Sequence, residues 1–161
     1  MYTLARLEET GISTYLRESG AAFFGTLTVH SLSLALVAGI NILVCCRMLG
    51  FARGIESGSL ASLYPPLWAA VSIVALSGLG LLLAYPAKAL TNPVFGIKLL
   101  ALGAGLLLAR RFQLLFLGRL QITASQTKAM AIVALLLWAT CIFTGRFLAY
   151  THSVLLASRF Y

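Results

Sequence analysis

Four long apolar runs alternate with shorter polar segments along this chain. The runs cover residues 21–45, 67–85, 92–109 and 129–150. At a rise of about 1.5 Å per helical residue, each run is long enough to cross a hydrocarbon core of about 30 Å. The pattern therefore predicts an all-α, polytopic membrane protein built as a four-transmembrane-helix bundle.

The polar segments predict how these helices are connected. Residues 1–20 carry apolar positions at helical spacing, which predicts a short amphipathic helix lying on the membrane interface. Residues 47–66 are rich in glycine, serine and proline and predict an irregular connection. A tight link is expected before Pro93, which suits the first turn of the third helix. Residues 110–128 are expected to form the last connection, which is basic and partly amphipathic.

Composition supports a membrane protein without a separate globular part. Hydrophobic residues make up 60% of the 161 residues and charged residues only 10%, whereas soluble domains carry about 25% charged residues. Residues 1–161 are therefore expected to form a single membrane domain. The formal charge is +8, but the basic residues lie beside the spans instead of forming a basic face with interleaved aromatics. We accordingly expect contact with membrane lipids and no binding of nucleic acid.

The distribution of basic residues predicts the orientation in the membrane. The loops after the first and third runs hold Arg47, Arg53, Arg110, Arg111, Arg119 and Lys128. The opposite side holds fewer basic residues, and three glutamates partly offset their positive charge. Because loops rich in Lys and Arg stay in the cytoplasm, both termini are expected outside. In a bacterium this corresponds to an inner-membrane protein with periplasmic termini.

Small residues recur at helical spacing and predict close helix contacts. They lie three or four positions apart, at Ala75, Ser77, Gly78 and Gly80 in the second run and at Ala101, Gly105 and Ala109 in the third. Such faces let backbones approach each other in lipid. They fit a compact bundle and a dimer equally well, so an oligomer or a subunit of a membrane complex is also expected.

Catalytic motifs are lacking. The chain has four acidic residues and shows no phosphate-binding loop, HExxH or GxSxG pattern. Its three cysteines have neither zinc-site nor CxxC spacing. The sequence therefore favours a protein that is not an enzyme.

Basic groups within the apolar runs are the functional lead. His30, Lys98 and Arg146 lie inside or at the ends of runs that contain no Asp or Glu. Placing a basic group within the membrane costs free energy, so such groups usually have a function. Counting along each helix from the basic loops places these residues, and His152, in the outer half of the membrane or at its outer surface. His30 also shares one helical face with other polar residues, which predicts that this face points inward.

Two interpretations of His30 are possible. It is either a hydrogen-bonded packing residue or an axial ligand of a b-type haem, for which His152 is the only other histidine available. The depths of His30 and His152 differ by roughly 11 Å, so joint ligation needs a tilted or bent helix.

Two interpretations are also possible for Lys98 and Arg146. Each either reaches the headgroups with its long side chain or pairs with an anion, such as a haem propionate. For Lys98, which is the deeper of the two, we expect an anionic partner within salt-bridge reach. The candidates are Glu18, a lipid phosphate, a substrate carboxylate or a propionate.

Several segments together resemble a known family. They are LEETGISTYLRES, TVHSLSLALVAG, CRMLG, TNPVFGIKLL and GRFLAY, at residues 7–19, 28–39, 46–50, 91–100 and 145–150. This order of motifs resembles a family of small four-span bacterial membrane proteins known as a domain of unknown function. The resemblance implies the fold and a membrane location but supplies no activity. A looser, fold-level similarity links the chain to cytochrome b561-like and copper-resistance-type membrane proteins.

One departure from the family concerns the end of the first span. The family's pattern includes the positions of Arg17, His30, Arg47, Lys98 and Arg146, commonly with an acidic residue just before the arginine that ends the first span. Here Cys45 and Cys46 precede Arg47. An acid-dependent role at this end is therefore in doubt.

These observations lead to three functional hypotheses. The first is a haem b electron-transfer module in the outer half of the bilayer, with His30 and His152 as ligands, Lys98 and Arg146 at the propionates, and a quinone or a periplasmic redox protein as partner. The second is a non-catalytic accessory, structural or lipid-binding subunit of a larger membrane complex. The third is a transporter, which would have to oligomerise.

Overall fold

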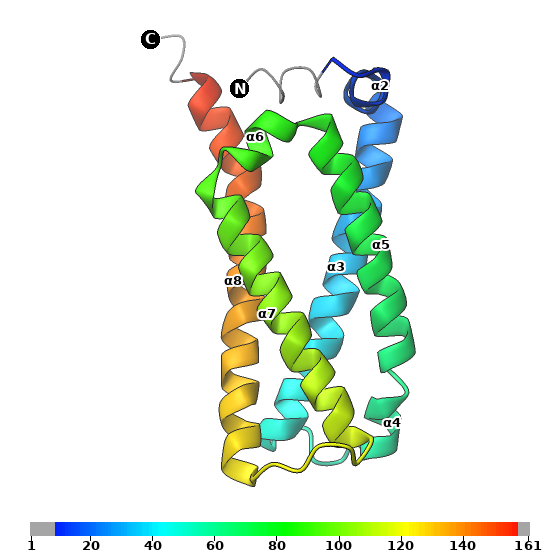
Figure 1. Cartoon of the computed structure of the whole chain (residues 1–161), viewed down its shortest axis with the longest axis vertical. Helices are drawn as coiled ribbons and strands as arrows, with labels where there is room; N and C mark the ends of the chain where they lie inside the picture. Colours follow the sequence, from blue (N-terminus) through cyan, green and yellow to red (C-terminus); the bar gives the residue numbers. More distant parts are fainter. Residues whose placement is uncertain (1–8, 158–161) are drawn as a thin grey trace. The chain divides into compact units, whose positions relative to one another are not determined.

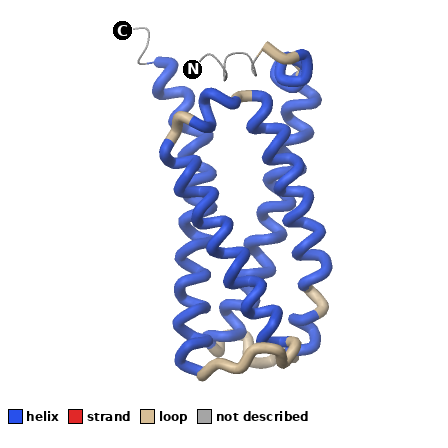
Figure 2. Tube along the Cα trace, in the orientation of Figure 1, coloured by secondary structure: helices blue, strands red, loops and turns tan. Residues whose placement is uncertain are grey.

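The computed structural model describes residues 9–157, apart from the side chains of residues 87–88 and 149–157. All regular secondary structure in this part of the chain is helical (Figures 1 and 2). The helices are α2 (Gly11–Glu18), α3 (Gly20–Leu49), α4 (Ser57–Ala61), α5 (Tyr64–Ala84), α6 (Pro86–Leu90), α7 (Pro93–Phe116) and α8 (Ala124–Ala157). Four stretches are long and apolar enough to cross a membrane, namely Gly20–Leu49, Ser57–Ala84, Pro93–Phe116 and Ala124–Leu148. The prediction of an all-α protein with four membrane-spanning helices is confirmed.

The chain forms two compact units, and each is described by itself. The first unit comprises Met1–Asn41 and Glu56–Thr91, and so includes α2, most of α3, and α4 to α6. The second unit comprises Ile42–Ile55 and Asn92–Tyr161, and so includes the last turns of α3 together with α7 and α8.

In the first unit, α3 and α5 meet through small residues on α5. A Cβ atom at Gly80 would lie 3.4 Å from the Thr26 methyl group, so the two backbones approach closely there. Towards the end of α5, the rings of Phe23 and Tyr85 meet edge to face, with centroids 5.7 Å apart. Gly80, one of the α5 positions that the sequence marks as a close-packing face, thus contacts α3.

The predicted amphipathic leader appears as α2, which packs against α5. Its Ser13 is fully buried, whereas Ile12 and Tyr15 are about two-thirds exposed. Ser19 separates α2 from α3 and caps the latter, because its hydroxyl accepts a hydrogen bond from the Ala22 amide at 3.3 Å. A short helix with outward apolar side chains suits the membrane interface.

In the second unit, α7 and α8 run side by side (Figure 1). The small residues predicted to form a packing face on α7, Ala101, Gly105 and Ala109, are all buried. Trp138 of α8 covers the middle of this face, because a Cβ atom at Gly105 would lie 3.2 Å from the indole ring. The absence of a side chain at Gly105 therefore provides the space for the largest buried side chain of this helix pair.

The ends of the helices are defined by hydrogen-bonding residues. Asn92 caps α7 by accepting a hydrogen bond from the Val94 amide at 2.9 Å, with Pro93 in the first turn as predicted. Two left-handed glycines end the helices before the basic loops, Gly50 after α3 (φ +93°) and Gly118 after α7 (φ +67°).

Both glycines form the same C-terminal motif. At each glycine, its own amide and the next amide bond to carbonyls of the preceding helical turn. This Schellman arrangement satisfies carbonyls that the end of a helix would leave unpaired.

The connection between α7 and α8 is shorter than the predicted 110–128. The charged side chains of Arg110 and Arg111 end the apolar run but leave the backbone helical, so α7 continues to Phe116. Thr123 and Gln126 then exchange hydrogen bonds at 3.0 and 3.2 Å, which forms a capping box and starts α8. Hydropathy marks the edge of the apolar stretch, whereas caps mark the ends of the helices.

Two predicted connections also contain short helices. Residues 57–61 form α4 within the segment 47–66 that was expected to be irregular, and residues 86–90 form α6 within the expected tight link. Pro65 and Pro66 lie in the first turn of α5, where a missing amide hydrogen leaves no helical bond unmade. They therefore separate α4 from α5 without disturbing the longer helix.

The contact between Gly105 and Trp138 predicts a position-specific effect of added volume. Gly105→Leu is expected to destabilise the protein by about 1–3 kcal/mol, because the rigid indole ring cannot make room for the new side chain. Thermal unfolding in detergent measures the change. Gly103→Leu is the matched control, since a Cβ atom at Gly103 meets no atom within 4 Å. Equal melting temperatures for the two variants would contradict this account of the α7–α8 contact.

Candidate functional site

The predicted site residues belong to both units. His30 lies on α3 in the first unit, and Lys98 and Arg146 lie on α7 and α8 in the second. His152 lies on α8 in the second unit, but its side chain is outside the described residues. Two separate sites therefore follow, one around His30 and one between α7 and α8.

His30 joins α3 to α5 through a hydrogen bond. Its Nδ1 atom lies 3.0 Å from the Ser77 hydroxyl oxygen. The single hydroxyl proton of Ser77 is already directed to the backbone, because Oγ donates to the Ile73 carbonyl at 2.6 Å. Nδ1 must then be the donor, which places the imidazole lone pair on Nε2. The structure thus selects one tautomer for a neutral His30.

The His30 ring also depends on a glycine. A Cβ atom at Gly78 would lie 3.2 Å from the ring carbon Cε1, which is tighter than ordinary contact. Ser77 and Gly78 therefore fix the position of the ring together, one by a hydrogen bond and the other by close approach. The face of α3 that carries Thr26 and His30 points towards α5; the sequence predicts an inward direction for this face but not the helix that it meets.

Lys98 lies on the side of α7 that packs against α8. Its ammonium nitrogen would be 3.8 Å from a Cβ atom at Gly145, and it lies within electrostatic range of Cys141, one turn earlier on α8. Lys98 is half-buried. The second unit has a lysine within its helix contact but contains no Asp or Glu in its sequence.

The expected anionic partner of Lys98 is therefore not an acidic side chain of its own unit. The same holds for Arg146, which is exposed on α8. Two cations thus lie near the end of the helix pair where α7 begins, and no residue of the unit provides a carboxylate side chain to neutralise them.

An apolar groove lies on the same helix pair. It has a volume of about 310 Å³, is open to one side, and is lined by Val94, Ile97, Phe143, Thr144 and Phe147. The Thr144 hydroxyl donates to the Thr140 carbonyl at 2.7 Å, so this side chain adds little polarity to the groove. Sequence reasoning missed the groove. The only indication was helical spacing, three residues from Val94 to Ile97 and four from Phe143 to Phe147, which places each pair on one face.

Neither cation is among the residues that line the groove. Lys98 follows Val94 by one turn on the same face of α7. Arg146 follows Thr144 by two residues on α8, and this spacing places it on the opposite side of α8 from the groove. The helix pair thus combines an apolar groove with a lysine held in the neighbouring helix contact. Chemically it suits a molecule that has both an apolar part and an anionic group.

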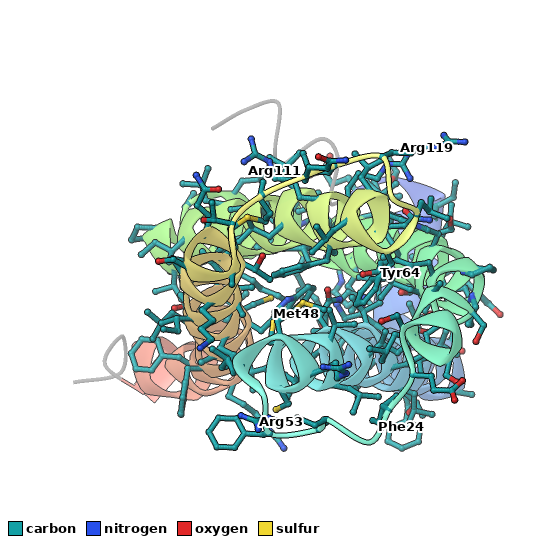
Figure 3. All side chains as sticks on the ribbon, turned by 90° about the horizontal axis from the view of Figure 1, so that it is seen from below. Phe24, Met48, Arg53, Tyr64, Arg111 and Arg119 are labelled. Atoms are coloured by element: carbon teal, nitrogen blue, oxygen red, sulfur yellow. The ribbon has the colours of Figure 1, made fainter. Side chains whose placement is uncertain are left out.

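The opposite end of the second unit carries the basic loops. Figure 3 views this end and shows Arg53, Arg111 and Arg119 on the outside of the ribbons. Arg47 holds the loop after α3, since its Nε donates to the Ile55 carbonyl at 2.8 Å. Arg53 lies over Gly50, with its guanidinium 3.3 Å from the position of a Cβ atom there. These two arginines therefore stabilise the conformation of the loop and also give it positive charge.

The chain was compared with protein-family models, curated proteins and solved structures, and no match was found. The resemblance to a four-span bacterial family and to cytochrome b561-like proteins therefore stays a prediction.

The link between His30 and Ser77 predicts a loss of stability when the hydroxyl is removed. Ser77→Ala leaves the Nδ1 proton without its acceptor inside the helix contact and should cost about 1–3 kcal/mol. Ser72→Ala is the control on the same helix, because the exposed Ser72 hydroxyl bonds only to the backbone of its own helix. Thermal unfolding of both variants in detergent measures the difference. If Ser77→Ala is no less stable than Ser72→Ala, the hydrogen bond does not hold α3 to α5.

Proposed function

We propose that this protein is a non-enzymatic, multi-pass membrane subunit that binds an anionic amphiphile on its α7–α8 helix pair. This is the accessory or lipid-binding function that the sequence offered as an alternative. The observation that carries the proposal is that Lys98, one turn after the groove residue Val94, lies in the α7–α8 contact of a unit whose sequence has no acidic residue.

The electrostatics of the helix pair support binding of an anion. A cation within a membrane-spanning segment normally faces a partner or a water-filled space, because hydrocarbon solvates it poorly. Lys98 is held against Gly145 on the helix contact. An anionic group next to the helix contact would neutralise Lys98 where it lies.

We also propose the inner membrane of a bacterium as the location, with both termini in the periplasm. The proposal rests on the excess of basic residues in the loops after α3 and α7. In this orientation the groove faces the outer leaflet, since it lies at the end of α7 opposite to the basic loops.

Replacing Lys98 tests the function. Lys98→Met keeps an apolar stem and removes the charge, so the protein purified from its native membrane is expected to lose a bound anionic molecule. Negative-ion mass spectrometry of the extracted small molecules measures this loss. Lys128→Met, in the basic segment at the other end of the unit, should retain the molecule. An identical set of anions in the wild type and in Lys98→Met would refute the proposed function.

Binding of haem b is a second candidate, and one observation favours it. Ser77 fixes His30 in the tautomer whose lone pair is on Nε2, and metal-ligating histidines commonly have their other ring nitrogen held by a hydrogen bond. His30 would be one axial ligand of a module that passes electrons to a quinone or to a periplasmic partner. His152 is the proposed second ligand, and Lys98 and Arg146 are the residues proposed to pair with the propionates.

An absorbance spectrum tests this second candidate. Protein in its native membrane should show a Soret band that shifts on addition of dithionite, and His30→Ala should abolish the band. Ser77→Ala should keep the band but change its position or its reduction potential, because the ligand loses its hydrogen-bond partner. A colourless wild-type protein, or a band that His30→Ala leaves unchanged, excludes haem ligation by His30.

A further inference from the structure

We infer that the loop after α3, residues 50–55, anchors the protein to an anionic membrane surface. Phe51 would enter the boundary between lipid headgroups and hydrocarbon, and Arg53 would pair with negatively charged headgroups beside it. The inference concerns the end of the second unit opposite to Lys98. It therefore does not depend on the proposed function, and it holds for either orientation of the chain in the membrane.

Phe51 is the most exposed large apolar side chain among the described residues, at 84%. Its amide bonds to the Cys46 carbonyl at 3.0 Å, which places it directly after the left-handed glycine of the Schellman motif. An apolar side chain at this position commonly packs on the preceding turn of the helix. The exposed ring of Phe51 does not do so, and it gains free energy only by entering an apolar environment outside the chain.

The loop is held in shape on both sides of Phe51. After it, Arg47 donates a hydrogen bond from Nε to the Ile55 carbonyl at 2.8 Å, which ties the end of the loop to the last turns of α3. Before it, Gly50 is left-handed and leaves space for the Arg53 guanidinium, whose Nε lies 3.3 Å from the position of a Cβ atom at Gly50. The outward position of the ring is thus a property of the loop structure, and Arg53 is fixed next to it.

The position and the charge of the loop favour an anionic lipid surface as this environment. Phe51 follows Leu49, the last residue of the membrane-spanning helix α3, by two residues. Segments 47–56 and 110–128 together hold six basic residues and one acidic residue, and basic residues beside a membrane-spanning helix attract anionic lipids. A long arginine side chain can also keep its charge among headgroups while its stem contacts hydrocarbon. A ring beside an arginine therefore matches the two layers of an anionic leaflet.

The end of α7 repeats this combination. Leu117 and Arg119 are both exposed and lie on either side of the left-handed Gly118. Arg53 and Arg119 both lie on the outside of the ribbons in Figure 3. Two helix ends of the same unit thus present an apolar side chain and an arginine to their surroundings. A membrane surrounds every helix end at its surface, whereas a protein partner would not require this repetition.

Photocrosslinking at position 51 tests the apolar part of the inference. Phe51→p-benzoylphenylalanine keeps an aromatic side chain at an exposed position, so the protein should fold as before. The full chain is irradiated in its native membrane, and mass spectrometry should then detect phospholipid adducts at position 51. The same change at Leu100, an exposed position within the membrane-spanning α7, is the positive control for lipid contact. The same change at Gln121, an exposed polar position in the loop after α7, should give far fewer adducts.

The same photoprobe tests the charged part in nanodiscs that contain equal amounts of phosphatidylglycerol and phosphatidylcholine. Adducts at position 51 should favour phosphatidylglycerol by about fivefold or more, and Arg53→Gln should lower this ratio about fivefold, the effect of one basic residue at an anionic surface. Arg53→Lys should preserve the ratio, which separates the charge from the guanidinium contact over Gly50. Because these adducts report only on lipid beside position 51, an anion bound near Lys98 does not affect them.

Four results would overturn the inference. Two concern the ring, namely crosslinking of position 51 to a protein or to nothing in place of lipid, and equally frequent lipid adducts at positions 51 and 121. Two concern the charge, namely no preference for phosphatidylglycerol at position 51, and a preference that Arg53→Gln leaves unchanged. None of these results bears on the loss of a native anion by Lys98→Met, so the proposed function and this inference can fail separately.

Discussion

Close approach of helix backbones is the constraint on which the structure depends. In a membrane, transferring the apolar surface of a helix from lipid to a neighbouring helix releases little free energy, because both surroundings are apolar. Helix association therefore relies on close van der Waals contact between complementary surfaces. Each unit achieves this with a ring against a glycine, His30 against Gly78 in the first and Trp138 against Gly105 in the second. The functional candidates lie on these same contacts or at their edges, since His30 is itself a contact residue and Lys98 lies on the contact of α7 with α8.

Sequence patterns predicted the elements better than their ends. Long apolar runs identified all four spanning helices, because length and hydropathy alone decide whether a helix can cross a membrane. The ends depend on local hydrogen bonds that hydropathy does not register. Thus the run ended at Ala109, whereas α7 ends only where Gly118 adopts a left-handed conformation and α8 begins at the capping box of Thr123 and Gln126.

The candidate sites were predictable only in part, for a related reason. The sequence shows that His30 and Lys98 are basic residues within apolar runs, and it also shows the small-residue face of α7. Their partners were not, because the pairing of His30 with Ser77 and of Lys98 with Gly145 depends on how two helices align along their length. The groove depends on the same alignment, since neither Phe143 nor Val94 indicates a binding surface alone.

The shared ending of α3 and α7 has a practical consequence for studies of this protein. At Gly50 and at Gly118 the chain leaves the helix through backbone hydrogen bonds. At Gly118, where no atom crowds the glycine, the following residues can change without altering the helix before them. The short segment between Arg119 and Ile122 is therefore a suitable place for a protease site or a small reporter tag that records which side of the membrane it faces.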